Sequence, residues 1–161
     1  SAKALVEAGA DSVKLEGGLT AQVEAIIAAG IPVMGHVGLL PQTAASYRRH
    51  GTDPEEAAGI VADALALDAA GCFAIVIEAV PPDLAERITA EVSAPTIGIA
   101  AGRECDGQVL VVSDLIGLSP DPPRFVRPKA NVHAVIVHTG AAFVAEVQAA
   151  DEEPAADGET S

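Results

Sequence analysis

The 161-residue sequence is long enough to form one domain with its own core, and half of its residues are hydrophobic. Aromatic residues make up only 2% and Trp is absent, so the core must consist of Ala, Val, Ile and Leu, which pack helices against sheets in α/β proteins. The net charge is −14 and the sequence has no basic stripe, which argues against nucleic acid as a partner.

Short runs rich in β-branched residues alternate along the chain with Ala-rich segments, a pattern typical of repeated βα units that build a parallel sheet. The sequence opens at Ser1 and enters directly into a helical segment, residues 2–8, so we expect the first strands of a longer protein to be missing. Five strands are predicted. They cover residues 12–15, 32–35, 73–77, 96–99 and 109–112.

The helices between these strands are marked by capping residues. Asp53 is predicted to cap a helix with Pro54 in its first position and Glu56 in its third, and Gly71 ends that helix. Asp83 and Glu86 repeat the pair after Pro81 and Pro82, and residues 20–29 form a helix that ends at Gly30. A long loop, residues 37–52, follows the second strand, where binding segments of α/β proteins commonly lie.

The C-terminal part of the sequence predicts a last helix from Asn131 to about Ala149, and then a short acidic tail. Six of the 23 acidic residues lie in residues 146–161, which contain no Lys or Arg. We therefore expect one α/β domain over residues 1–149 and a disordered tail over residues 150–161.

The predicted fold is a (β/α)₈ TIM-type barrel, incomplete here, with about five C-terminal βα units. A closed barrel needs eight strands and about 250 residues, so the first strands would lie outside this chain. The alternative is a doubly wound open sheet, which needs no closure. We favour the barrel because no Gly-rich phosphate-binding loop follows any predicted strand and because of the polar residues at the strand ends.

Four polar side chains fall at the same end of three successive strands: Lys14, Glu16, His36 and Glu78. Lys14 and Glu16 are two residues apart, so a strand directs both to one face, and an ionised pair there requires a partner, a substrate or a metal. A structural ion pair is the alternative explanation. In barrels the strand C-termini form the active face, so this coincidence favours a catalytic site.

Glu78 stands after an apolar strand, where partial burial can raise the pKa of a carboxyl group towards general acid/base use. The alternative is a hydrated Glu outside the core, and for His36 it is a structural hydrogen bond. Glu16 is the only one of the four placed to bind a hard cation such as Mg²⁺, which keeps several waters and needs few protein ligands.

The chain resembles the ketopantoate hydroxymethyltransferases (3-methyl-2-oxobutanoate hydroxymethyltransferases). The resemblance rests on ordered stretches from residue 10 onwards: ADSVKLEGG (10–18), GHVGLLPQ (35–42), DALALDAAG (63–71), IEAVP (77–81), PTIGI (95–99) and CDGQVLV (105–111). It implies a (β/α)₈ barrel, a large homo-oligomer resembling a decamer, and Mg²⁺ as cofactor. The implied reaction is transfer of a hydroxymethyl group from 5,10-methylenetetrahydrofolate to 3-methyl-2-oxobutanoate, the first step of pantothenate synthesis.

By the same resemblance, Glu16 corresponds to a metal ligand, Lys14 to an oxoacid-binding residue, His36 to a substrate contact and Glu78 to the catalytic acid/base. Two further Asp ligands would lie on earlier strands, so we expect this chain alone to be inactive. Alternatives are an oxoacid C–C lyase of the phosphoenolpyruvate-mutase type and a non-catalytic assembly subunit.

The remaining features predict a soluble, cytoplasmic protein without a membrane partner. Cys72 and Cys105 lack metal-ligand spacing and are expected to be reduced thiols. No leader sequence opens the chain, and no stretch approaches the roughly 18 apolar residues that a membrane span requires.

Overall fold

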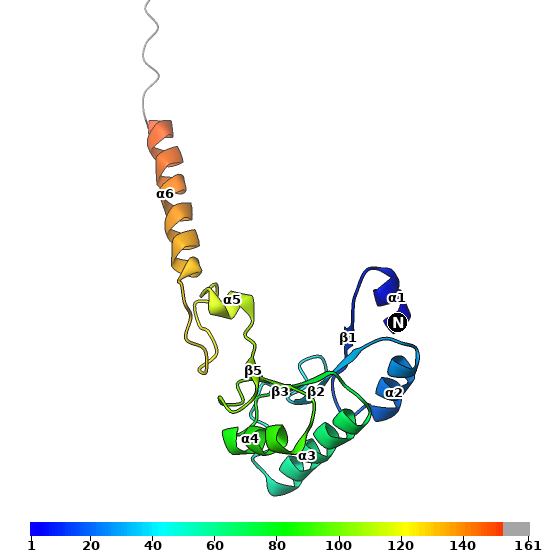
Figure 1. Ribbon diagram of the computed structural model, residues 1–161. Helices are drawn as coiled ribbons and strands as arrows, with labels where there is room; N and C mark the ends of the chain where they lie inside the picture. Colours follow the sequence, from blue (N-terminus) through cyan, green and yellow to red (C-terminus); the bar gives the residue numbers. More distant parts are fainter. Residues whose placement is uncertain (153–161) are drawn as a thin grey trace, which may run out of the picture. The chain divides into compact units, whose positions relative to one another are not determined.

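The computed structural model describes residues 1–152, which form alternating helices and strands (Figure 1). The chain divides into two compact units, Ser1–Val109 and Leu110–Ser161. The strands are β1 (Val13–Lys14), β2 (Val33–Gly38), β3 (Ala74–Glu78), β4 (Thr96–Ile99) and β5 (Gly107–Gln108). The helices are α1 (Ala2–Glu7), α2 (Thr20–Ala28), α3 (Pro54–Ala69), α4 (Pro82–Glu91), α5 (Val112–Leu115) and α6 (Val132–Glu152).

The five strands form one parallel sheet in the order β1-β2-β3-β4-β5, so each strand pairs with its neighbour in the sequence. Helices α2, α3 and α4 lie on one side of this sheet (Figure 1). A doubly wound sheet would reverse its strand order and carry helices on both faces. Sequential order with one helical layer is instead the arrangement of a βα barrel wall, and it favours the predicted TIM-type fold.

The register of the sheet separates two kinds of side chain. Val33, Val37, Ile75 and Ile77 point to the helical layer and are buried in the core. The alternate positions, which include His36 and Glu78, point to the opposite face because successive side chains on a strand alternate. The sequence pattern of the strands therefore decides which residues build the core and which remain for a site.

Helix α3 confirms the predicted start at Asp53. The Asp53 carboxylate accepts hydrogen bonds from the backbone N–H groups of Glu55 and Glu56, and Pro54 occupies the first helical position. The buried face of the helix lies against the sheet. It consists of Ile60, Val61, Ala64 and Leu67.

Two strands differ from their predicted ranges. Strand β2 continues three residues past Gly35, so His36 lies inside the strand instead of following it. The prediction of a strand over residues 109–112 was wrong: β5 ends at Gln108, and Val112 begins α5. The β-branched run looked like a strand, but only the two residues that pair with Ile97 and Gly98 are strand residues.

The predicted cap of α4 was also wrong. Pro81 takes the N-cap position and no side chain caps the helix, so Asp83 lies in the first turn. Helix α6 confirms the predicted last helix, with the Asn131 side chain accepting from the backbone N–H of Ala134. The helix continues to Glu152, so it includes the first residues of the expected tail, and residues 153–161 lie outside the described part of the chain.

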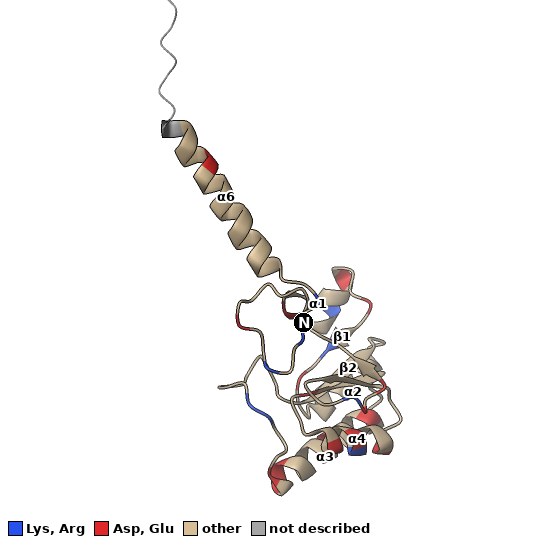
Figure 2. Cartoon of the chain, turned by 90° about the vertical axis from the view of Figure 1, so that its left-hand side faces the viewer, with Lys and Arg blue, Asp and Glu red and all other residues tan. Residues whose placement is uncertain are grey.

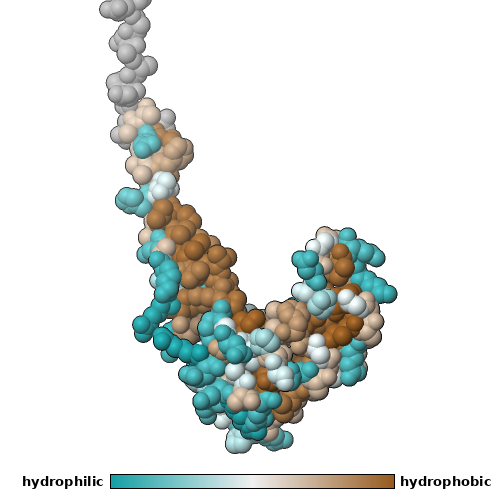
Figure 3. Space-filling model, viewed as in Figure 1, coloured by the Kyte–Doolittle hydropathy of each residue, from teal (hydrophilic) through white to brown (hydrophobic). Residues whose placement is uncertain are grey.

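Helix α6 has an apolar surface that is exposed in the structure (Figure 3). Residues 132–150 of this helix carry one acidic side chain and no Lys or Arg (Figure 2). The expectation that no stretch approaches a membrane span needs correction, because Val132–Ala150 has a mean hydropathy of 1.3 and sufficient length. Length and composition in a single helix are weak evidence for a span. The exposed large apolar residues are Val135, Ile136, Val137, Phe143, Val144 and Val147.

Candidate active site

The four predicted site residues lie at the C-terminal end of three adjacent strands. Lys14 ends β1 and Glu16 follows two residues later, His36 lies in the second half of β2, and Glu78 ends β3. In the pairing of β2 with β3, His36 lies opposite Val76 and Gly38 opposite Glu78. His36 and Glu78 are therefore one side-chain repeat apart on the same face of the sheet.

Lys14 and Glu16 form the first pair. The Lys14 Nζ atom lies 3.5 Å from Glu16 Oε1, with the Lys side chain 40% exposed and the Glu side chain 11% exposed. The other carboxylate oxygen of Glu16 accepts a hydrogen bond of 3.1 Å from the backbone N–H of Gln42. The carboxylate is thus held in place by the loop after β2, whereas the ammonium group is open to an anion.

His36 and Glu78 form the second pair, with His36 Nε2 3.4 Å from Glu78 Oε2. His36 is almost fully buried, and its Nε2 atom lies 2.8 Å from the carbonyl oxygen of Leu39. Because a carbonyl only accepts, Nε2 carries the proton and the neutral ring presents Nδ1 as an acceptor. No hydrogen-bond partner of Nδ1 occurs among the described residues.

Burial and neighbouring charges shift both members of this second pair. Burial raises the pKa of Glu78, and the Glu16 carboxylate raises it further against the opposing effect of Lys14. Burial lowers the pKa of His36, and Lys14 lowers it further, against the Leu39 carbonyl and Glu16. A neutral imidazole thus lies beside a carboxyl group that takes up a proton more readily than an exposed Glu.

The two pairs act on one another through their charges. Lys14 and Glu16 both contribute to the pKa shifts of His36 and of Glu78, which is the effect of groups that share one site. The structure therefore brings the four predicted residues to one end of the sheet. Direct polar contacts join them only within each pair in the described part of the chain.

A metal ion would find one suitable ligand in this site. Among the described residues, no three His, Cys, Asp or Glu side chains are grouped closely enough to hold a metal. The Glu16 carboxylate is oriented by Gln42 and is only partly exposed, so it fits as a single oxygen ligand of Mg²⁺, which commonly binds through one or two carboxylates.

Comparison with known proteins places the chain in a family. Residues 1–152 match the sequence model of a family described as ketopantoate hydroxymethyltransferase. The chain belongs to the ketopantoate hydroxymethyltransferase family.

The curated relatives carry the name 3-methyl-2-oxobutanoate hydroxymethyltransferase. The 3-methyl-2-oxobutanoate hydroxymethyltransferase of Geotalea uraniireducens is 49% identical over 148 residues, which cover 88% of this chain and 55% of the relative. The enzyme of that name from Salinibacter ruber is 49% identical over 152 residues, covering 91% of this chain and 57% of the relative. The one from Pyrobaculum calidifontis is 47% identical over 153 residues, covering 92% and 58%. The chain thus spans about half the length of these relatives.

Sequence reasoning missed several residues that shape this site of a ketopantoate hydroxymethyltransferase chain. Gln42 and Leu39 act through backbone atoms, which leave no side-chain signal in the sequence. Ala79, directly after Glu78, has a φ of +52° that no residue type predicts. The signal that could have indicated Leu39, Gln42 and Ala79 was that they lie in the GHVGLLPQ and IEAVP stretches, which also contain His36 and Glu78.

Proposed function

We propose that the full-length protein transfers a hydroxymethyl group from 5,10-methylenetetrahydrofolate to 3-methyl-2-oxobutanoate, giving 2-dehydropantoate in the first step of pantothenate synthesis. The observation that carries this proposal is the family match over residues 1–152 together with the cluster of Lys14, Glu16, His36 and Glu78. The lyase and non-catalytic alternatives are not favoured, because the curated relatives are named as transferases.

The pair at the end of β1 is proposed to bind the oxoacid. The partly exposed Lys14 ammonium group would bind a substrate carboxylate or an oxygen that gains negative charge. Glu16 would hold Mg²⁺ with one carboxylate oxygen, and the two further Asp ligands implied by the resemblance would lie outside this chain. When bound, Mg²⁺ supplies Lewis-acid polarisation of the 2-oxo group, which acidifies the adjacent C–H.

The pair of β2 and β3 is proposed to move protons and to line the site. Glu78 combines partial burial with a raised pKa, so it can exchange a proton near neutral pH more effectively than an exposed Glu. His36 would line the substrate site beside Glu78, with the proton of Nε2 directed to the carbonyl oxygen of Leu39.

The full-length protein is further proposed to complete a (β/α)₈ barrel, to be cytoplasmic and to form a homo-oligomer. The sequential parallel sheet with helices on one side supports the barrel. The exposed apolar side chains of α6 support the oligomer, since contiguous apolar surfaces mark interaction sites. The two cysteines are free and buried, as expected for reduced thiols in the cytoplasm.

Two substitutions in the full-length protein test the proposed roles. Glu16→Gln is expected to weaken Mg²⁺ binding by at least about tenfold, because even loss of an outer-shell partner of a metal costs that much. Glu78→Gln is expected to leave Mg²⁺ affinity unchanged and to lower kcat by about 10²–10⁴, the usual contribution of an acid/base group. Calorimetric Mg²⁺ titration and steady-state kinetics measure the two effects.

The matched control is Glu24→Gln, which changes the same chemical group at an exposed position of α2. It is expected to match the unsubstituted protein in both measurements. Equal Mg²⁺ affinity of the unsubstituted protein and the Glu16→Gln variant contradicts the ligand role. Absence of hydroxymethyl transfer by the full-length protein contradicts the proposed function as a whole.

A further inference from the structure

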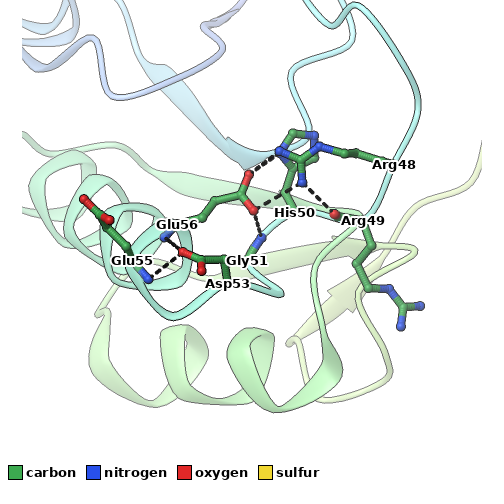
Figure 4. A network of polar contacts seen from close by, with 7 residues as sticks. All are labelled: Arg48, Arg49, His50, Gly51, Asp53, Glu55 and Glu56. Atoms are coloured by element: carbon green, nitrogen blue, oxygen red, sulfur yellow. Dashed lines mark hydrogen bonds and ion pairs between the residues drawn. The ribbon is translucent and has the colours of Figure 1, made fainter.

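One carboxylate, that of Glu56, holds the end of the loop between β2 and α3 (Figure 4). It accepts from Arg48 Nη2 at 2.7 Å and Arg48 Nη1 at 3.2 Å. His50 Nδ1 lies 2.9 Å away, and the backbone N–H of Gly51 donates to it at 2.8 Å. Three residues of the loop are thereby bound to the first turn of α3.

This network is more than the cap of α3. The Asp53 side chain already caps the helix by accepting from the backbone N–H groups of Glu55 and Glu56. In a capping box, Glu56 would bond back to the N–H of Asp53. Here its carboxylate instead contacts residues 48, 50 and 51, so it connects the helix to the loop.

The bound loop segment contacts the chain directly after Glu78. The backbone N–H of His50 donates to the carbonyl oxygen of Ala79 at 2.8 Å. Ala79 has a φ of +52°, a left-handed conformation that is strained for a residue with a Cβ and persists only where the surroundings hold it. The bond from His50 is one of the contacts that hold this residue.

Packing constrains the backbone of Gly51, which follows His50 in the loop. Gly51 is buried with a φ of +73°, and a Cβ at this position would collide with the Leu84 side chain of α4. The loop therefore enters the core between α3 and α4. There the Glu56 carboxylate accepts a hydrogen bond from the backbone N–H of Gly51. The place of His50, one residue earlier, follows from this anchored position.

We propose that Glu56 is a positioning residue for Glu78, acting through His50 and Ala79. The network holds the backbone after β3 from the end of the loop, while the N–H of Leu39, the residue after β2, donates to the Glu78 carbonyl oxygen. The carboxyl group of Glu78 is then held beside His36 in one orientation. This inference rests on the proposed function, in which Glu78 is the acid/base.

The test compares Glu56→Gln with Glu55→Gln in the full-length protein. Both variants remove one carboxylate charge from the first turn of α3, but the Glu55 side chain is exposed and contributes nothing to the network. Glu56→Gln is expected to lower kcat by about tenfold or more, because displacement of a catalytic group by about 1 Å costs as much as 10²-fold. The KM for the oxoacid and the Mg²⁺ affinity should change less than about twofold, since Lys14 and Glu16 lie at the end of β1 and Glu16 contacts Gln42 at the start of the loop, whereas Glu56 binds the end of the loop.

Three outcomes of this comparison decide the inference. A kcat fall confined to Glu56→Gln, at unchanged KM and Mg²⁺ affinity, supports it. Equal kcat for Glu55→Gln and Glu56→Gln overturns it. A fall in kcat accompanied by a raised KM and weaker metal binding also overturns it, because these changes together indicate a general loss of structure. An inactive unsubstituted protein overturns the proposed function instead.

If Glu56→Gln does not fold, Arg48→Met removes an exposed partner of the same carboxylate and is expected to lower kcat by a smaller factor at constant KM. An unchanged kcat in that variant then overturns the inference.

Discussion

At the residue scale, the chemistry of the site follows from the different surroundings of four side chains. Lys14 remains open to an anion, Glu16 is oriented by a backbone N–H, and Glu78 lies beside the buried ring of His36. Glu78 is the carboxyl group that we propose for proton transfer, because burial raises its pKa.

His36 is expected to titrate below 6.5 in the Mg²⁺-free full-length protein. Burial favours its neutral form, and the Lys14 charge adds to this effect. Because the unfolded protein then binds the proton more readily, the contribution of His36 to stability decreases as the pH falls through 6.5. NMR titration of the imidazole measures the midpoint, and Lys14→Met should raise it. A midpoint at or above 6.5 would contradict the buried neutral ring.

At the element scale, the loop between β2 and α3 depends on one glycine and one carboxylate. Gly51 passes between α3 and α4 where a side chain has no room, and Glu56 binds the loop residues around it. Both features belong to local geometry, so we expect their substitution to change the free energy of unfolding, which is measured separately from kcat.

Gly51→Ala is expected to destabilise the protein by about 1–3 kcal/mol, since it combines a strained positive φ with a collision at Leu84. The control is Gly59→Ala in α3, where a Cβ meets no atom within 4 Å. That change should stabilise by about 0.5–1 kcal/mol, because Ala is the better helix residue. Urea denaturation measures both, and equal effects of one sign would refute the prediction.

The pKa of Glu56 is lowered from 4.5 to about 2, chiefly by its hydrogen bonds with Arg48 and with the backbone of Gly51. A lowered carboxyl pKa stabilises the folded state fully above the unfolded value, and this contribution is lost as the pH falls from 4.5 towards 2. The difference in Tm between the unsubstituted protein and Glu56→Gln should therefore be constant above about pH 5.5 and shrink below about pH 4.5. A difference that persists unchanged to pH 3 would exclude this contribution.

At the scale of the whole molecule, the second compact unit carries an apolar helix, α6, whose side chains are not covered by the described residues of that unit. The exposed apolar side chains of α6 occupy successive turns of the helix (Figure 3). None of the residues in its apolar stretch, Val132–Ala150, is buried. An apolar surface of this kind in a full-length protein is expected to be covered by another surface.

Phe143→Glu in the full-length protein is therefore expected to shift the proposed homo-oligomer to smaller species, because it places a charge in the exposed apolar surface of α6. Gln148→Glu is the control: it adds the same charge to the same helix without removing apolar area. Light scattering coupled to size-exclusion chromatography measures the mass. Retention of the full mass by Phe143→Glu would exclude this surface as the interface.

The sequence by itself predicted the parallel α/β class, four of the five strands within a few residues, and the start of α3 at Asp53. These features depend on short-range rules, namely side-chain alternation and helix capping, which act within a few residues of the chain. The family was also accessible from sequence, since its motifs are contiguous stretches.

Only the tertiary structure decided where β5 ends, which hydrogen bonds orient Glu16 and His36, and how Glu56 is connected to Ala79. Each of these depends on atoms that are distant in sequence or belong to the backbone. The apolar run after Gln108 has the propensity of a strand, but a strand continues only where a neighbouring strand supplies hydrogen bonds. The pairing with β4 ends at Gln108, followed by one bond from the Val109 N–H to the Gly98 carbonyl oxygen.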